Sequence, residues 1–220
     1  MKVKMKITST LSHRFAALLC VIFLSLATAT ATAQDKKILV VGDSLSAAYG
    51  MAVEDGWVAG LQHRLDGTRY QYNVINASVS GDTTANGLTK LPALLKEYQP
   101  EIVLIELGGN DGLRGLSLKK MKQNLIEMSQ MAADSDATVI ILGMKIPSNY
   151  GAAYTRLFSK TFVTAAEESN AQLIPFFLEG LEKSMEWFQS DGIHPNEKAQ
   201  VIMLDNVWQP LVSVIDSLEN

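Results

Sequence analysis

Five short apolar runs, separated by stretches with helical periodicity, constrain the fold of this 220-residue chain more than any other feature. The runs are rich in Val, Ile and Leu without strict alternation of polar residues, which is typical of strands buried on both faces of a sheet. Strands that alternate with helices predict a parallel sheet with right-handed crossovers, enclosed by helices as a three-layer α/β/α domain. The expected strands are residues 36–42, 71–77, 101–108, 138–143 and 171–176.

Apolar residues recur at helical spacing between these runs. Further helices are expected over 158–168 and 197–218, the latter bent or broken at Pro210, because proline lacks the N–H that continues a helix. No internal repeat or linker interrupts the pattern, so residues 34–220 are interpreted as a single domain. The three apolar stripes are Trp57/Leu61/Leu65, Leu88/Leu91/Leu95 and Leu118/Met121/Leu125/Met128.

The first 33 residues differ in kind from the rest. Residues 2–14 carry four basic and no acidic side chains, 15–26 form an apolar run, and 27–33 are small residues ending in Ala-Thr-Ala. This order is typical of a secretory signal peptide. The alternative is a membrane anchor, but twelve residues span only about 18 Å of a bilayer core that is ~30 Å thick. We therefore expect cleavage after Ala33, export to the periplasm or secretion, and no stable membrane anchor in the mature protein.

Without residues 1–33, called the leader below, the rest of the chain has a different composition from the whole sequence. The only cysteine, Cys20, lies in the leader, so the mature protein has no disulfide and must be held together by a packed core. It carries 15 basic and 23 acidic residues, a formal charge of −8. Such an acidic protein is a poor candidate for binding nucleic acid or anionic membranes. We expect a monomer whose partners are small molecules.

Three polar segments that contain glycine follow the first three expected strands. They are Gly-Asp-Ser-Leu-Ser at 42–46, Asn-Ala-Ser-Val-Ser-Gly-Asp at 76–82 and Gly-Gly-Asn-Asp at 108–111. The carboxyl ends of parallel strands meet at one edge of a sheet, where ligands bind, so these segments are expected to converge. A fourth polar segment, 190–196, lies just before the last expected helix.

Ser44 is a candidate nucleophile because it directly follows a strand, at the expected start of a helix. The alternative interpretation is a helix N-cap, a common role for serine. A nucleophilic serine needs a base, and only His63 and His194 remain after the leader is removed. His63 lies about 160° from the apolar stripe of its helix at ~100° per residue, which predicts exposure to solvent. His194 is therefore the better candidate base.

Asp191, three residues before His194, can accept a hydrogen bond from one ring nitrogen and fix the tautomer of the imidazole. The alternative is that Asp191 caps a turn and that His194 is incidental. The order Asp-Gly-x-His-Pro favours the first interpretation, because Gly192 and Pro195 would hold both side chains on one short loop.

A serine nucleophile also requires donors for the oxyanion that develops during attack. The N–H groups of Ser44 and Gly81 and the side-chain amide of Asn110 are the candidates. Competing motifs are absent: the sequence has no G-x-S-x-G elbow, no H-E-x-x-H, no P-loop and no G-x-G-x-x-G after a strand. No metal and no cofactor are expected, since two separate histidines do not make a metal cluster.

The four blocks G-D-S-L-S, the Gly81 loop, G-G-N-D and D-G-I-H-P-N resemble those of the SGNH/GDSL hydrolase family. The resemblance extends in order over residues 36–212, and four blocks at these spacings are far more specific than one. It implies a flavodoxin-like sheet with strand order 2-1-3-4-5. It also implies that Ser44 is the nucleophile, His194 the base and Asp191 its partner. Gly81 and Asn110 would join the Ser44 N–H in the oxyanion hole.

The resemblance further implies two-step acyl transfer through an acyl-serine, with lysophospholipids, aryl and p-nitrophenyl esters and acyl-CoA thioesters as substrates. In such relatives the segment that corresponds to 144–154 is a mobile flap over the acyl chain. Here Ile146, Pro147 and Tyr150 would supply apolar contacts to substrate. The alternative is an ordinary turn-rich loop.

Two other functions use the same fold. A carbohydrate O-acetyl esterase would share the chemistry, but the apolar flap and the lack of a sugar-binding appendage disfavour it. A non-catalytic lipid carrier would need none of the catalytic residue types, yet all of them are present at suitable spacing. Rates on esters of different acyl length would distinguish a lipid-type esterase from a carbohydrate O-acetyl esterase. Hydrolysis of p-nitrophenyl esters would exclude a non-catalytic lipid carrier.

Overall fold

The computed structural model describes residues 36–219 and Met1, and the described residues form one parallel sheet of five strands in the order β2-β1-β3-β4-β5. The expected fold class and the strand order implied by the resemblance are both confirmed. β1 has the expected length, and the other four strands are shorter than the apolar runs that predicted them. The leader and its cleavage bond lie outside the described residues. The strands are β1 (Lys36–Gly42), β2 (Tyr72–Asn76), β3 (Ile102–Glu106), β4 (Thr138–Leu142) and β5 (Gln172–Ile174).

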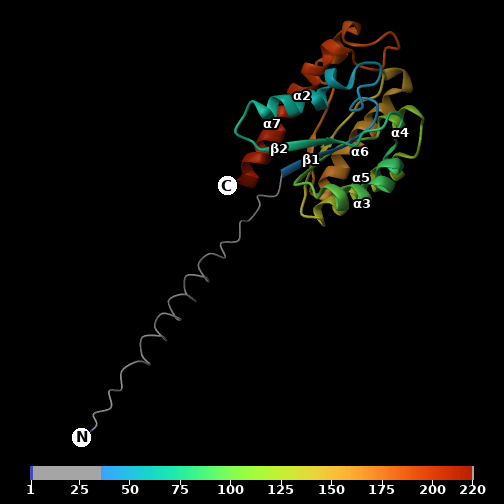
Figure 1. Cartoon of the computed structure of the whole chain (residues 1–220). Helices are drawn as coiled ribbons and strands as arrows, with labels where there is room; N and C mark the ends of the chain where they lie inside the picture. Colours follow the sequence, from blue (N-terminus) through green and yellow to red (C-terminus); the bar gives the residue numbers. More distant parts are fainter. Residues whose placement is uncertain (2–35, 220) are drawn as a thin grey trace. The chain divides into compact units, whose positions relative to one another are not determined.

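Helices cover both faces of the sheet (Figure 1). α2 and α7 pack together on one face, and α3, α5 and α6 form the layer on the other. Residues 38–41 of β1 and 102–105 of β3 are fully buried, as expected for central strands covered on both sides. No helix within residues 36–219 has both the length and the apolar character to span a bilayer. The helices are α2 (Trp57–Asp66), α3 (Thr84–Tyr98), α5 (Leu118–Ala133), α6 (Ala152–Ser169) and α7 (Gln200–Glu219).

α7 continues through Pro210 as one helix, so of the expected bend or break at this proline, the break is wrong. Proline in a helix interior costs about 3 kcal/mol, because it removes a backbone hydrogen bond and crowds the preceding turn. Val207 on one side of Pro210, and Leu211 and Val214 on the other, are buried in the core. This packing holds both halves of α7 against the sheet and offsets the local cost.

The segment after β1 does not start a helix, which corrects the expectation for Ser44. The N–H of Ala47 donates to the carbonyl oxygen of Asp43 at 3.0 Å and closes a single turn. Ala48 then has a φ of +56°, a left-handed conformation that ends the turn. The next α-helix begins only at Trp57. Ser44 therefore lies in a tight turn, and the interpretation of Ser44 as a helix N-cap is wrong.

The last three residues of the polar segment Gly-Gly-Asn-Asp begin the short helix α4 (Gly109–Leu113). Asp111 on this helix is buried and accepts hydrogen bonds from the N–H of Thr84 at 2.9 Å and its hydroxyl at 2.6 Å. Those bonds tie α4 to the first turn of α3 and so fix the position of Asn110. α6 also begins earlier than expected, at Ala152 rather than at residue 158.

Candidate active site

Ser44, His194 and Asp191 form a chain of hydrogen bonds that links the loop after β1 to the loop before α7. The Nε2 atom of His194 lies 2.9 Å from the Oγ atom of Ser44, and Nδ1 lies 2.6 Å from the Oδ2 atom of Asp191. An ionised carboxylate can only accept hydrogen bonds, so Nδ1 carries the proton and Nε2 accepts from the Ser44 hydroxyl. The structure thus brings together the serine, histidine and carboxylate that the sequence singled out.

Asp191 also holds the backbone of its own loop. Its Oδ1 atom accepts from the N–H of Ile193 at 2.9 Å and from the N–H of His194 at 3.0 Å. The hydrogen bond from the His194 side chain, followed by these two backbone bonds, lowers the pKa of Asp191 to about 2. Gly192 has a φ of +67°, which explains a glycine between the two side chains. Asp191 therefore caps a turn and orients His194 at the same time.

The His194 loop is fastened to the turn that carries Ser44. The side-chain amide of Gln189 donates to the carbonyl oxygens of Tyr49 at 2.8 Å and Pro195 at 3.1 Å. The Tyr49 ring packs on the His194 ring, with their centroids 4.3 Å apart. Sequence reasoning missed Tyr49 and Gln189, because this link joins segments 140 residues apart and leaves no local pattern.

The candidate oxyanion donors differ in whether they are already hydrogen-bonded. Within residues 36–219, neither the N–H of Ser44 nor the N–H of Gly81 donates a hydrogen bond to a protein acceptor. The side-chain amide of Asn110 has two acceptors, the Oδ2 atom of Asp43 at 3.1 Å and the carbonyl oxygen of Asp82 at 3.0 Å. Two backbone donors are thus free, whereas the amide of Asn110 is fully used in the absence of substrate.

Arg114 is a further residue at this site that sequence reasoning missed. Its guanidinium donates to the carbonyl oxygen of Gly81 at 3.1 Å and to the Oδ1 atom of Asn110 at 3.2 Å. It therefore connects two of the candidate oxyanion residues. A sequence signal exists, since residues four apart share a face of a helix and Arg114 follows Asn110 by four.

The candidate substrate loop contacts α4 rather than the Ser44 turn in this conformation. Ile146 is only 7% exposed and belongs to the hydrophobic core, whereas Pro147 is exposed. Tyr150 is 40% exposed, and its hydroxyl donates to the carbonyl oxygen of Leu113 at 3.1 Å. Among the described residues, no hydrogen bond joins these three residues to Ser44 or His194. The loop is therefore anchored to the end of the helix that carries Asn110.

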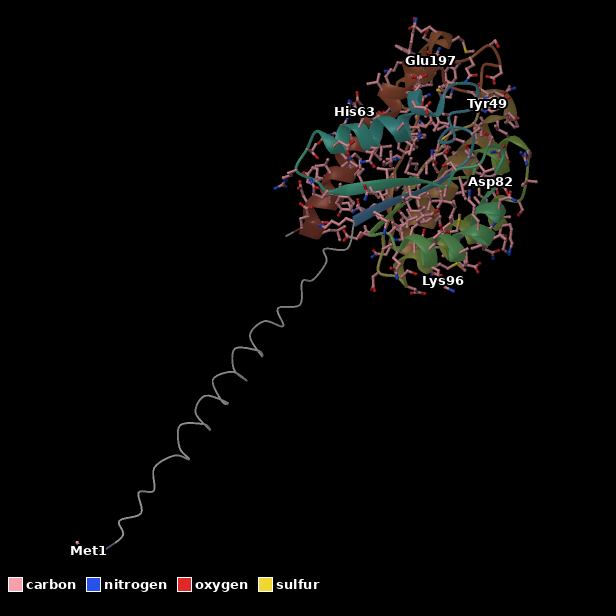
Figure 2. All side chains as sticks on the ribbon, viewed as in Figure 1. Met1, Tyr49, His63, Asp82, Lys96 and Glu197 are labelled. Atoms are coloured by element: carbon pink, nitrogen blue, oxygen red, sulfur yellow. The ribbon has the colours of Figure 1, made fainter. Side chains whose placement is uncertain are left out.

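His63 is exposed on α2, as its helical position predicts. Figure 2 shows His63 away from Tyr49, which packs on His194, and from Asp82, whose carbonyl oxygen accepts from Asn110. In the part of the chain that the structure describes, no three His, Cys, Asp or Glu side chains are grouped as a metal site. An open cavity of about 320 Å³ lies beside the His194 loop. Its lining residues are Gly50, Met51, Gln189, Asn196, Glu197 and Lys198.

Comparison with known proteins places these features in a family. Residues 40–202 match the GDSL-like Lipase/Acylhydrolase family. The chain is 49% identical to Esterase TesA of Pseudomonas aeruginosa over 188 residues, which covers 86% of this chain and 94% of that protein. It is 43% identical over 197 residues to Thioesterase 1/protease 1/lysophospholipase L1 of Escherichia coli K12, which covers 87% of this chain and 92% of the relative.

A solved structure gives the same result. The esterase EstA from Pseudoalteromonas sp., in a structure inhibited by monoethylphosphonate, superimposes with a TM-score of 0.78 and 41% identity. That superposition covers 84% of this chain and all of the other. The fold, the four sequence blocks and these similarities agree, and this protein belongs to the GDSL-like lipase/acylhydrolase family.

Proposed function

We propose that this acylhydrolase cleaves acyl esters and thioesters by two-step transfer through a covalent acyl-Ser44 intermediate. The observation that carries the proposal is the pair of hydrogen bonds that joins Ser44 to His194 at 2.9 Å and His194 to Asp191 at 2.6 Å. A serine hydroxyl is a weak nucleophile unless a base removes its proton during attack. His194 is hydrogen-bonded to Ser44, and Asp191 holds it in the tautomer whose Nε2 atom can accept the hydroxyl proton.

In the first step, the Oγ atom of Ser44 attacks the carbonyl carbon while Nε2 of His194 takes the hydroxyl proton. Asp191 stabilises the imidazolium and keeps its Nδ1–H in place. His194 then gives the proton to the leaving alcohol or thiol, and the acyl group stays on Ser44. In the second step, water attacks the acyl-enzyme with His194 again as base, which releases the carboxylic acid and restores Ser44.

The developing oxyanion would be bound by the N–H groups of Ser44 and Gly81 and by the side-chain amide of Asn110. The absence of protein acceptors for the two N–H groups within residues 36–219 supports their part in this role. Asn110 would exchange one of its two acceptors for the oxyanion. The carbonyl oxygen of Asp82 is the neutral acceptor of the two, so we infer that this bond is the one exchanged.

Lipid-type acyl chains are the substrates that we propose. The relatives named above include a thioesterase and a lysophospholipase, and the loop 144–154 offers apolar residues beside α4. Pro147 and Tyr150 are accessible and would contact the acyl chain first. Ile146 is buried, so it would contact substrate only when this loop opens.

We propose that residues 1–33 are a signal peptide and that the mature enzyme acts in the periplasm. The basic start, apolar run and small-residue end of this segment support the proposal. Acyl-CoA is made inside the cell, so lysophospholipids and other envelope lipid esters fit this compartment better as physiological substrates. Aryl and p-nitrophenyl esters would serve as assay substrates.

The proposal is tested by the hydrolysis of p-nitrophenyl esters by Ser44→Ala and His194→Ala. Both variants should lose activity by roughly 10³-fold or more, because nucleophile and base act as a unit. His63→Ala is the matched control, since it removes an exposed histidine on α2 and should keep the parent rate. A Ser44→Ala variant as active as the parent would exclude the acyl-serine mechanism.

A further inference from the structure

Two carboxyl groups lie side by side in the core directly beneath the Ser44 turn. Asp43 precedes Ser44 and is 2% exposed, and Glu106, the last residue of β3, is fully buried. Gly42 of β1 pairs in register with Glu106, which places Glu106 beside the start of the turn. A Cβ atom on Gly42 would lie 2.8 Å from the Oε2 atom of Glu106 and 2.7 Å from the Oγ atom of Ser46, so the glycine leaves room for these two side chains.

The two carboxyl oxygens of Glu106 differ in their hydrogen bonds. The Oε2 atom of Glu106 accepts from the N–H of Asp43 at 3.2 Å and from the hydroxyl of Ser46 at 2.8 Å. The Oε1 atom of Glu106 is buried and, within residues 36–219, receives no donor. An ionised Glu106 would therefore bury a charged oxygen without a hydrogen bond, which is strongly unfavourable.

Asp43 is also bonded to the backbone of the Ser44 turn and to Asn110. Its Oδ1 atom accepts from the N–H of Leu45 at 3.1 Å, and its Oδ2 atom accepts from the side-chain amide of Asn110 at 3.1 Å. These bonds join the backbone of the Ser44 turn to a candidate oxyanion donor. Both partners are donors, so they favour Asp43 as a carboxylate.

The electrostatics assign one proton to the pair. Burial, followed by the negative charge of Asp43, raises the pKa of Glu106 well above its usual range. Burial also raises the pKa of Asp43, to about 6, and the bonds from Leu45 and Asn110 oppose that rise. A positive charge on His194 also favours the ionised form of Asp43. At neutral pH, two adjacent buried carboxyl groups of this kind hold one proton between them, on Glu106.

We propose that Glu106 is a positioning residue for the acyl-transfer site. As a neutral acid it donates a hydrogen bond from its carboxyl group to the Asp43 carboxylate, and its Oε2 atom accepts from the N–H of Asp43 and the hydroxyl of Ser46. Asp43, held in this way, fixes the Asn110 amide and the turn of Ser44 in the arrangement that binds the oxyanion. This inference rests on the proposed acyl transfer at Ser44, and it adds a residue that does not touch substrate.

The protonation state is tested by ¹³C NMR of protein labelled at the glutamate side-chain carboxyl carbon. One glutamate carboxyl group should remain protonated at pH 7. That signal should be absent from Glu106→Gln and present in Glu127→Gln, which changes an exposed glutamate on α5. A parent spectrum in which every glutamate ionises near the ordinary pKa would overturn the proposal.

The positioning role is tested by the kinetics of Glu106→Gln and Glu106→Leu. Glutamine keeps both acceptor and donor, so its kcat should stay within about threefold of the parent. Leucine cannot donate to Asp43, so its kcat should fall by about 10-fold or more, within the ~10²–10³-fold that a lost oxyanion donor costs, while KM changes little. A Glu106→Leu variant with the parent kcat would contradict the role.

Two controls distinguish a failure of the role proposed for Glu106 from a failure of the acyl-serine mechanism. Active sites are titrated with a p-nitrophenyl phosphonate, so that kcat is expressed per competent site and a merely unstable variant does not mimic a positioning defect. Inactive Ser44→Ala together with unchanged Glu106→Leu would reject only the role of Glu106. Active Ser44→Ala would reject the acyl-serine mechanism itself. If Glu106→Leu does not fold, the NMR titration of the parent and Glu106→Gln still decides the protonation on which the proposal depends.

Discussion

Replacement of Asp191 by Asn should stop catalysis while leaving the loop intact. The Oδ1 atom of Asp191 accepts the N–H groups of Ile193 and His194, and an amide oxygen can keep both bonds. The amide nitrogen would then face Nδ1 of His194, where Oδ2 now lies at 2.6 Å. A donor at that position forces the proton of the imidazole onto Nε2. Nε2 then cannot accept the proton of Ser44.

The expected loss of kcat is about 10³–10⁴-fold. A tautomer-reversing Asp-to-Asn change in a serine hydrolase triad costs ~10⁴-fold. The Asp191 side chain is 38% exposed, so water can partly replace the lost acceptor, and the lower end of the range applies. This corresponds to about 4–5.5 kcal/mol of transition-state stabilisation.

The assay is hydrolysis of p-nitrophenyl butyrate across pH, with thermal unfolding measured in parallel. The parent should lose activity as acid protonates His194, since an imidazolium cannot act as a base. Asp191 has a pKa lowered to about 2, so it stays ionised above pH 4 and its own titration does not change the activity in that pH range. Its contribution to folding is present above its ordinary pKa and is lost as the pH falls through about 2. A variant with more than about a tenth of the parent kcat would refute the reasoning.

Other consequences follow from the same geometry. Asn110→Ala should lower kcat by roughly 10²–10³-fold with little change in KM, whereas Asn73→Ala, on the exposed face of β2, should not. Glu106→Gln should raise Tm more at pH 8 than at pH 4. The raised pKa of Glu106 favours the folded parent at low pH, and that stabilisation is lost as the pH rises through the raised pKa. Glutamine does not ionise, so the variant keeps its stability at pH 8. Esters with acyl chains of two to sixteen carbons should show a preference beyond acetyl, and a sharp optimum at acetyl would instead support carbohydrate deacetylation. Mass spectrometry of protein exported from an expressing bacterium should find a chain that begins after Ala33, and an intact leader would contradict the signal peptide.

The sequence predicted the parts of this molecule that depend on local pattern. Buried strands show as apolar runs because both faces of the sheet are covered, and their parallel order brings loops from distant parts of the chain to one edge. Helical phase predicted that His63 is exposed, which the structure confirms, and the carboxylate three residues before His194 favoured His194 as the base. Convergence of the segments after β1, β2 and β3 followed from topology, whereas the pairing of His194 with Ser44 was inferred by elimination between two histidines.

Features that depend on contacts between distant segments were not predicted. The turn at Ser44 is set by the left-handed Ala48, and the persistence of α7 through Pro210 is set by packing on the core. Tyr49 acts through a partner that no local spacing reveals, whereas the helical spacing of four between Asn110 and Arg114 was a signal that sequence reasoning missed. Glu106 did leave a signal, since an acid inside a fully apolar strand is rarely buried without a partner.

The most direct test of the acyl-serine mechanism is peptide mapping after inactivation by an alkyl p-nitrophenyl phosphonate. Phosphonates form a stable tetrahedral adduct with the nucleophile of acyl transfer, and a phosphonate also inhibits the related esterase EstA. One equivalent of adduct should form on the peptide that contains Ser44, and none should form in Ser44→Ala. An adduct on any other residue, or loss of activity without an adduct on Ser44, would contradict the mechanism.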